Sequence, residues 1–273
     1  MMPELVKLTI NGKKVEAPLG MTVFEAAKRE GIFIPTLCHH EPLEPEGTCR
    51  LCIVEVSGSM RHSLRVSCIL EVQEGLVVET ETERIRKNRR LILELLLGRS
   101  PYCKELLDLA GQLGVTASRF RTGEDDDCVR CGRCVRVCRD KIGVYALCWV
   151  NRGFERKITT DFERLSEYCI GCGACANVCP TGAIKIEDRG GERKLYTWGQ
   201  VLARFKLEKC EHCGTPFAPK KYLDLISEKA YKPKGLELVH YICPECYKER
   251  DRLPEARREA SLRKAVKWAV PRP

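Results

Sequence analysis

Two cysteine runs with identical spacing constrain this chain more than any other feature of its sequence. Both read C-x2-C-x2-C-x3-C, and their members are Cys128, Cys131, Cys134 and Cys138, then Cys169, Cys172, Cys175 and Cys179. Three thiolates on one tight loop can bind three corners of a cubic [4Fe-4S] cluster, so the fourth ligand must come from elsewhere in the chain. The runs therefore predict two such clusters.

Each run carries a fourth cysteine besides the three that one loop can place on a cluster, and an exchange of fourth ligands between two clusters explains it. In the two-cluster ferredoxin arrangement, the last cysteine of each run binds the other cluster. One cluster would be held by Cys128, Cys131, Cys134 and Cys179, and the second by Cys169, Cys172, Cys175 and Cys138. Zinc is the simpler alternative, but zinc sites close with pairs of C-x2-C and would leave cysteines over. Disulfides would suit a secreted chain, and the usual signs of secretion are missing.

The composition favours several small modules over one large core. The 273 residues include 18 cysteines but only 7% aromatic residues, and metal binding can itself supply folding free energy. The N-terminus has no apolar run of signal-peptide length, and no stretch approaches the roughly 18 apolar residues of a membrane span. We expect a soluble, cytoplasmic chain in a reducing compartment, where thiols stay available for metal.

More than half of the net positive charge lies near the C-terminus of the sequence. The formal net charge is +9, and the stretch from Lys248 to Pro273 holds nine Lys and Arg against four Asp and Glu, which gives 9 − 4 = +5. A basic helix is predicted from Glu255 to Val270. It is either a solvated charged helix or an arm that docks on another subunit, and the sequence does not choose between them.

The N-terminal segment predicts a small mixed sheet with its own cluster. Leu5–Ile10 and Lys13–Ala17 flank Asn11-Gly12, the strongest short hairpin signal. Thr22 and Glu25 form a capping box ahead of a helix that should end at Gly31. The first four cysteines, Cys38, Cys49, Cys52 and Cys68, suit a [2Fe-2S] cluster by their spacing, with zinc as the alternative.

From Gly47-Thr-Cys-Arg-Leu-Cys-Ile-Val-Glu-Val56 onward, the chain resembles a known family. The hairpin, capped helix and cysteine spacing are similar to the β-grasp ferredoxin domain that opens the large iron–sulfur subunit of NADH dehydrogenase and subunits of NAD-linked and iron-only hydrogenases. The resemblance covers about residues 4 to 187.

One cluster segment of that family is degenerate here. In the family, a helix like Thr82–Leu97, which should end at Gly98 in this chain, leads to a His-plus-three-Cys [4Fe-4S] segment. Here Ser100 stands where the histidine is expected and only Cys103 remains. We therefore expect no cluster there and a structural or free thiol at Cys103.

The remaining cysteines fall into a hairpin and two C-terminal knuckles. A hairpin is predicted over Val144–Thr160, with Cys148 as small apolar filling on one strand. Cys210, Cys213, Cys243 and Cys246 form two C-x2-C knuckles, which match a structural zinc ribbon, with a further iron–sulfur cluster as the alternative. His212 and His240 are expected to be solvated, and an amphipathic helix is predicted over Pro219–Ala230.

The expected fold class is α+β and modular. The predicted segments are a β-grasp [2Fe-2S] domain (1–81), a helical connector with a degenerate His-Cys segment (82–122), a two-[4Fe-4S] ferredoxin domain (123–195) opened by an acidic linker, a four-cysteine knuckle module (196–249) and a basic helical tail (250–273). Because close spacing of clusters speeds electron transfer, the N-terminal and central domains should pack together across the connector, Leu91–Leu113. The four arginines of the first run, Arg130, Arg133, Arg136 and Arg139, should give the first [4Fe-4S] cluster the higher reduction potential.

The predicted function is electron transfer without catalysis in this chain. The resemblance implies an FMN-bearing, NAD(P)H-oxidising partner and a catalytic oxidoreductase subunit, such as a hydrogenase, a formate dehydrogenase, an aldehyde oxidoreductase or a bifurcating complex. The alternative is a redox-sensing regulatory or nucleic-acid-binding protein that contains zinc and clusters. The mixture of basic and acidic residues and the scarcity of aromatic residues argue against a nucleic-acid surface.

Overall fold

The structure is a computed structural model that describes residues 4–120, 127–197, 199–229 and 241–251. The chain divides into two compact units, residues 1–159 with 174–184, and residues 160–173 with 185–273. Each unit is described by itself. Most of the acidic linker, His240 and the predicted tail helix lie outside the described residues.

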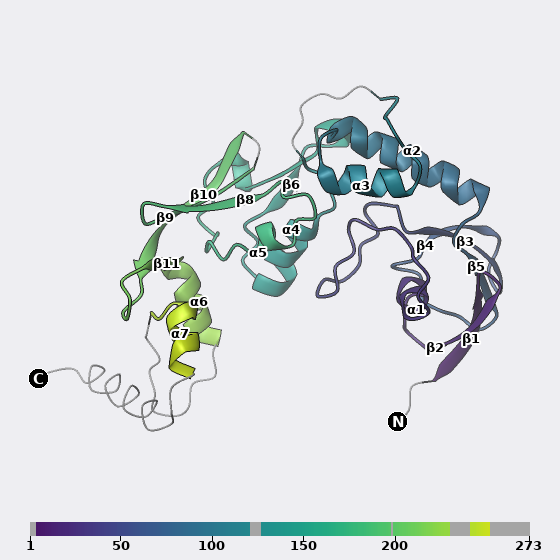
Figure 1. Cartoon of the computed structure of the whole chain (residues 1–273), viewed down its shortest axis with the longest axis horizontal. Coiled ribbons are helices and arrows are strands. Elements are labelled where there is room, and N and C mark those ends of the chain that lie inside the picture. The colour runs from purple at the N-terminus through teal and green to yellow at the C-terminus, as the bar shows by residue number, and fades with distance from the viewer. Residues whose placement is uncertain (1–3, 121–126, 198, 230–240, 252–273) are drawn as a thin grey trace, which may run out of the picture. The chain divides into compact units, whose positions relative to one another are not determined.

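The N-terminal part of the first unit is a five-stranded mixed sheet (Figure 1). Its strands are β1 (Leu5–Ile10), β2 (Lys13–Pro18), β3 (Ile53–Gly58), β4 (Ser63–Val66) and β5 (Leu76–Glu79), in the order β2-β1-β5-β3-β4. β1 and β5 are parallel and the other pairs are antiparallel. The predicted hairpin is confirmed, with Asn11 and Gly12 at φ 50° and 77° between β1 and β2.

Helix α1 (Val23–Arg29) packs on this sheet through an apolar face. Both hydrogen bonds of the predicted capping box are present, from the Glu25 amide to Thr22 Oγ1 and from the Thr22 amide to the Glu25 carboxylate. Val23, Phe24, Ala26 and Ala27 are buried in the same core as the strands. This sheet and helix are the mixed architecture expected of the N-terminal segment.

Two helices follow the sheet and lie side by side, α2 (Glu83–Arg99) and α3 (Lys104–Gln112) (Figure 1). Thr82 caps α2 by accepting a hydrogen bond from the Ile85 amide. The prediction that Gly98 ends this helix was wrong by one residue. A Cβ on Gly98 would lie 3.2 Å from Phe120 Cβ and from Ser118 Oγ. A glycine at this position of α2 therefore lets the segment of Ser118 and Phe120 pack closely against the helix.

One hydrophobic core joins the N-terminal segment, the connector and the first cysteine run. Its buried residues include Leu51 of the N-terminal segment, Leu93 and Leu106 of the two helices, and Val129 and Cys131 of the run. The predicted close packing across the connector is therefore confirmed.

Short helices carry the cysteine runs of the first unit. α4 (Arg133–Arg136) continues into η1 (Val137–Ile142), a π-helical turn that carries Cys138, and α5 (Ala174–Asn177) carries Cys175. The predicted hairpin is present but short, with β6 (Cys148–Val150) paired to β7 (Lys157–Thr159) around the 3₁₀ turn η2 (Gly153–Glu155). Cys148 is half-buried on β6, where its thiol lies 3.6 Å from the carbonyl oxygen of Thr159.

The second unit is built on a four-stranded antiparallel sheet. Its strands are β8 (Lys185–Arg189), β9 (Glu192–Thr197), β10 (Gln200–Lys209) and β11 (Pro216–Pro219), in the order β11-β10-β9-β8. Strand β9 crosses residue 195, the predicted boundary between the ferredoxin domain and the knuckle module. The unit also holds the 3₁₀ turn η3 (Asp161–Glu163) and the helices α6 (Lys220–Lys229) and α7 (Pro244–Asp251), and α6 confirms the predicted amphipathic helix. Among the described residues, no helix has the length and apolar character needed to cross a membrane.

Candidate metal centres

The first four cysteines come together beside the N-terminal sheet. Cys38 follows α1, Cys49 and Cys52 lie in the loop before β3, and Cys68 follows β4. All four are buried. The thiol of Cys38 exchanges hydrogen bonds with those of Cys49 and Cys68, and these bonds lower the pKa of Cys38 while they raise that of Cys68. A hydrogen bond from Cys68 lowers the pKa of Cys52 to about 7.

Hydrogen-bond donors surround this group of sulfurs. The Leu37 amide donates to Cys49 Sγ at 3.4 Å, and Thr36 Oγ1 lies 3.8 Å from the same sulfur. Gly47 has φ +62°, and a Cβ there would lie 3.0 Å from Val66 Cγ1, so any larger residue would be strained where this loop passes the sheet. Four buried thiols with hydrogen-bond donors beside them fit an iron–sulfur cluster, whose sulfurs accept such hydrogen bonds.

The predicted ligands of the first [4Fe-4S] cluster all belong to the first unit. Cys131 and Cys134 are buried, and burial raises the pKa of both thiols. The charges of Cys128 and Cys179 raise the pKa of Cys134 further, which shows that the last cysteine of the second run lies near the first run, as an exchange of fourth ligands requires.

The predicted ligands of the second cluster are divided between the two units. Cys138 lies in η1, where the Ala146 amide donates to its sulfur at 3.3 Å, and Cys175 is buried on α5. Cys169 and Cys172 belong to the second unit. Their loop is tight, because Gly171 has φ +70° and a Cβ there would lie 2.7 Å from Phe205 Cδ2 and from Pro219 Cγ.

Direct hydrogen bonds join the loop of the first four cysteines to the first cysteine run. Thr48 Oγ1 donates to the carbonyl oxygen of Cys131 at 2.9 Å. Arg133 donates to the carbonyl oxygen of His39 at 2.5 Å, and Arg136 donates to that of Cys38 at 2.5 Å. The negative charge of a Cys38 thiolate also raises the pKa of Cys131. Two groups of predicted ligands therefore meet within one packed unit.

The four C-terminal cysteines converge most tightly. The sulfurs of Cys210, Cys213, Cys243 and Cys246 all lie within 4.8 Å of one another, and those of Cys213 and Cys243 are 3.8 Å apart. A tetrahedral ion with Zn–S bonds of about 2.3 Å places its thiolates about 3.8 Å apart. A cubane has irons and sulfides between its ligands and needs a wider opening. Within the described residues, no other group of thiols, imidazoles or carboxylates comes close enough together to hold a single ion.

Hydrogen bonds favour the ionised form of the two thiols of the first knuckle, Cys210 and Cys213. Burial opposes the Cys210 thiolate, but the amides of Cys243, Cys213 and His212 outweigh it and lower the pKa of Cys210 to about 6. The side chain of Thr215 lowers the pKa of Cys213. A thiolate at neutral pH is the form that binds a metal ion.

The scaffold of this site differs from the ribbon that the knuckle spacing predicted. The first knuckle closes the β10–β11 hairpin, where Gly214 has φ +75° and its amide donates to the Cys210 carbonyl at 2.8 Å. The second knuckle opens helix α7. Pro244 stands at the first helical position, where a missing amide proton has no cost, and this signal was available in the sequence. His212 is exposed, as expected.

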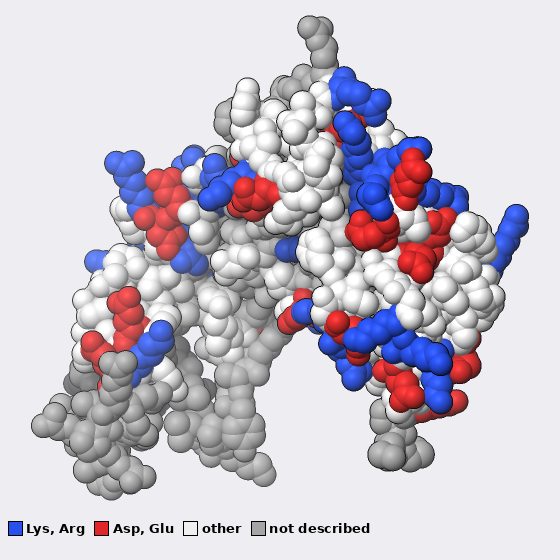
Figure 2. Space-filling model, turned by 45° about the vertical axis from the view of Figure 1, so that its right-hand side comes forward, with Lys and Arg blue, Asp and Glu red and all other residues white. Residues whose placement is uncertain are grey.

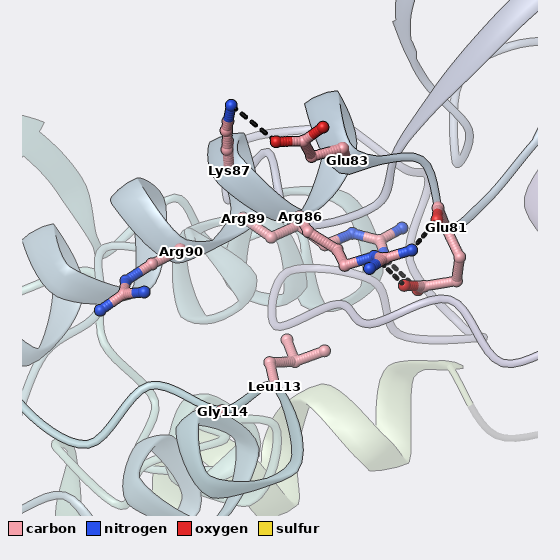
Figure 3. A pocket seen from close by; sticks show the side chains of 8 residues that line it. All are labelled: Glu81, Glu83, Arg86, Lys87, Arg89, Arg90, Leu113 and Gly114. Atoms are coloured by element: carbon pink, nitrogen blue, oxygen red, sulfur yellow. Dashed lines mark hydrogen bonds and ion pairs between the residues drawn. The ribbon is translucent and has the colours of Figure 1, made fainter.

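A small polar cavity lies beside α2. It has a volume of about 200 Å³ and is lined by Glu81, Glu83, Arg86, Lys87, Arg89, Arg90, Leu113 and Gly114 (Figure 3). Its carboxylates pair with its cations, as in Lys87–Glu83 at 2.8 Å and Arg89–Glu81 at 2.6 Å. Its lining includes no Ser, Thr, Cys, His or Tyr side chain.

The single cysteine of the connector remains a thiol in the core. Cys103 is 3% exposed and its sulfur donates to the Glu105 carboxylate at 3.4 Å. Burial raises its pKa to about 11, so it stays protonated at neutral pH. Ser100, at the position of the family's histidine, is fully buried at the end of α2.

Comparisons with known proteins found two matching iron–sulfur domain families. A 2Fe-2S iron–sulfur cluster binding domain matches residues 4–83, and a 4Fe-4S dicluster domain matches residues 168–216. A subunit of the NADH-quinone oxidoreductase of Rhizobium meliloti (strain 1021) is 34% identical over 237 residues, which are 77% of this chain and 27% of that protein. The NADP-reducing hydrogenase subunit HndD of Solidesulfovibrio fructosivorans is 36% identical over 211 residues, 66% of this chain and 36% of that protein.

A solved structure extends the similarity to the fold. A chain of the NAD⁺-reducing [NiFe]-hydrogenase in the H₂-reduced state is 31% identical, with a TM-score of 0.51 over 57% of this chain and 75% of that chain. This chain spans about a quarter to a third of the length of the two curated relatives. It belongs to the family of iron–sulfur subunits found in NADH-quinone oxidoreductases and in NAD(P)-linked hydrogenases.

Proposed function

We propose that this chain is an electron-transfer subunit of an NAD(P)H-linked oxidoreductase complex and carries no catalytic site of its own. Cys38, Cys49, Cys52 and Cys68 hold the [2Fe-2S] cluster. Cys128, Cys131, Cys134 and Cys179 hold the first [4Fe-4S] cluster, and Cys138, Cys169, Cys172 and Cys175 hold the second. Each cluster accepts and returns single electrons, while the protein fixes the positions of the clusters and tunes their potentials.

The contact between two ligand loops supports this proposal most directly. The hydrogen bond from Thr48 to Cys131 joins a residue adjacent to Cys49 to a predicted ligand of the first [4Fe-4S] cluster. Arg136, two residues after Cys134, donates to the carbonyl of Cys38. A binding or regulatory protein has no need for two redox sites in such contact, whereas an electron relay depends on it.

The C-terminal site is proposed to hold one zinc ion in a structural role. The 3.8 Å separation of two of its sulfurs matches a single tetrahedral ion, and all four ligands are thiols, which leaves no open position for a substrate. The ion would join the β10–β11 hairpin to α7, a helix whose own sequence, PECYKERD, offers little apolar surface.

The proposed partners are a flavoprotein subunit that binds FMN and oxidises NAD(P)H, and a catalytic oxidoreductase subunit, in a cytoplasmic hetero-oligomer. The family supports this assignment, since the relatives are named as subunits of NADH- and NADP-linked oxidoreductases. Affinity purification from the native host, followed by identification of the co-purifying subunits, tests it.

Metal and sulfide analysis of anaerobically purified protein, combined with EPR, tests the cofactor assignment. About ten iron and about one zinc per chain are expected from one [2Fe-2S], two [4Fe-4S] and one tetrathiolate site. About fourteen iron without zinc would place a third [4Fe-4S] cluster at the C-terminal cysteines. Iron-free protein that is folded and binds its partners would overturn the electron-transfer function.

A nucleic-acid role receives no support from the charge distribution. On the face shown in Figure 2, groups of described Lys and Arg side chains lie beside groups of Asp and Glu side chains. Binding to duplex DNA that falls steeply with salt concentration would favour that alternative.

A further inference from the structure

We propose that Arg89 and Arg136 are positioning residues for the [2Fe-2S] cluster: each clamps one of its cysteine loops and adds positive charge that favours the reduced cluster. This inference rests on the proposed assignment of Cys38, Cys49, Cys52 and Cys68 to that cluster. The two arginines are the largest of the fully buried side chains among the described residues.

Arg89 holds the loop of Cys49 and Cys52 from the connector. Its side chain, on α2, is 2% exposed. Nε donates to the carbonyl oxygen of Leu51 at 3.1 Å, and Nη2 donates to that of Ile53 at 2.9 Å. These carbonyls belong to the residues on either side of Cys52, so the guanidinium fixes the backbone that presents this thiolate.

Arg136 holds the loop of Cys38 from the first cysteine run. Its side chain is 1% exposed. Nη2 donates to the carbonyl oxygen of Cys38 at 2.5 Å, and Nη1 donates to that of Glu44 at 2.6 Å. The two contacts hold the loop between these residues against α4, so the segments of Cys38 and of Cys52 are each fixed by a guanidinium from a later part of the chain.

The charges of these arginines are only partly compensated by carboxylates. Arg89 pairs with Glu81 at 2.6 Å, and Glu81 is 52% exposed (Figure 3). Arg136 Nε lies 3.7 Å from Glu46, which is 36% exposed and lies closer to Arg139, at 2.9 Å. A buried cation is costly unless a negative group compensates it. The anionic cluster and its thiolates are that group.

Reduction places one electron on the cluster and requires no proton, so its negative charge rises by one. A fixed positive charge nearby stabilises the reduced form more than the oxidised form and raises the reduction potential. Arg136 should have the larger effect, because its carboxylate partner is more distant and is shared with Arg139.

The test is an EPR-monitored potentiometric titration of the [2Fe-2S] signal in the full chain. For Arg136→Met we expect the ratio of reduced to oxidised cluster at a fixed potential to fall about tenfold, equivalent to about 59 mV for one electron. Arg89→Met should shift it in the same direction by less. Arg136→Lys keeps the charge but not the fork of donors, so its potential should stay near that of the wild type. Lys87→Met, an exposed cation two residues from Arg89, should leave the potential unchanged.

A second pair of variants tests the charge effect without removing a buried group. Glu46→Gln and Glu81→Gln remove the carboxylates that offset the two arginines, and both should raise the potential. Unchanged potentials in these variants and in the methionine variants, with full cluster occupancy, would overturn the inference. Absence of any [2Fe-2S] signal in the wild-type protein would instead overturn the ligand assignment on which the inference rests.

Discussion

The hydroxyl of Thr48 donates a hydrogen bond to the carbonyl oxygen of Cys131 at 2.9 Å, across 83 positions of sequence. The contact joins two loops that carry predicted ligands of different clusters. Each loop therefore helps to hold the other in its folded position.

Replacement of Thr48 by valine tests this link. The variant keeps the side-chain shape but loses the donor, and we expect the free energy of unfolding to fall by about 1 kcal/mol, the usual net value of one hydrogen bond. The loss of visible cluster absorption during denaturation measures it. Thr116 is exposed, so Thr116→Val serves as the control. Equal stability of the two variants would show that the contact contributes nothing.

Replacement of Cys213 by serine should remove the C-terminal ion alone. The variant loses one of four thiolates, so we expect about one zinc fewer per chain and unchanged iron. Cys148→Ser, which changes a thiol outside every predicted ligand set, should retain all metals. Loss of about four iron from the Cys213 variant would identify the site as a cluster.

Replacement of Cys103 by alanine should leave the iron content unchanged. Cys103 is the single cysteine of the connector, so no neighbouring thiol of that segment could complete a cluster with it. Its pKa of about 11 keeps it protonated. We expect only the packing cost of a small side chain, about 1 kcal/mol. In the folded wild-type protein, alkylation of this buried thiol should be slow. Iron loss in the variant would show that Cys103 is a ligand.

Replacement of Gly171 by alanine should weaken the second [4Fe-4S] cluster selectively. The added Cβ would overlap Phe205 and Pro219 at 2.7 Å, and such overpacking costs about 1–3 kcal/mol. We expect the EPR amplitude of the cluster assigned to this loop to fall while the other signals persist. Gly190 also has positive φ, +61°, but open space around it. Gly190→Ala therefore controls for backbone strain, and equal losses in both variants would exclude the steric explanation.

The first [4Fe-4S] cluster should have a higher reduction potential than the second. Arg130, Arg133 and Arg136 donate to backbone carbonyls within the first unit, and their positive charge favours a reduced cluster. Arg139 contributes less, because it pairs with Glu46 and Asp140. Potentiometry on cysteine variants that retain one [4Fe-4S] cluster each measures the order, and the reverse order would contradict the charge effect.

Local signals predicted local structure well. The Asn11-Gly12 turn and the Thr22–Glu25 capping box depend on residues within a few positions of each other, and both formed as expected. Cysteine spacing predicted which thiols converge at the C-terminal site. The prediction that Gly98 ends α2 failed. This glycine lies inside the helix, at a point where Phe120 packs closely against it, and that contact forms only after folding.

The two buried arginines could not be recognised in the sequence. Arg89 lies among other basic residues of a helix, and Arg136 belongs to a run with an arginine at every third position. The backbone carbonyls to which they donate lie between 36 and 98 positions away. Only the tertiary fold distinguishes a buried guanidinium from its solvated neighbours.

The core that contains Leu51, Leu93, Leu106 and Val129 limits how such a chain can be divided. A fragment cut after the N-terminal sheet would leave Leu51 without the helices that cover it, and the helices alone would expose their leucines to water. The compact unit to which this core belongs, residues 1–159 with 174–184, should therefore be transferred to another protein only as a whole.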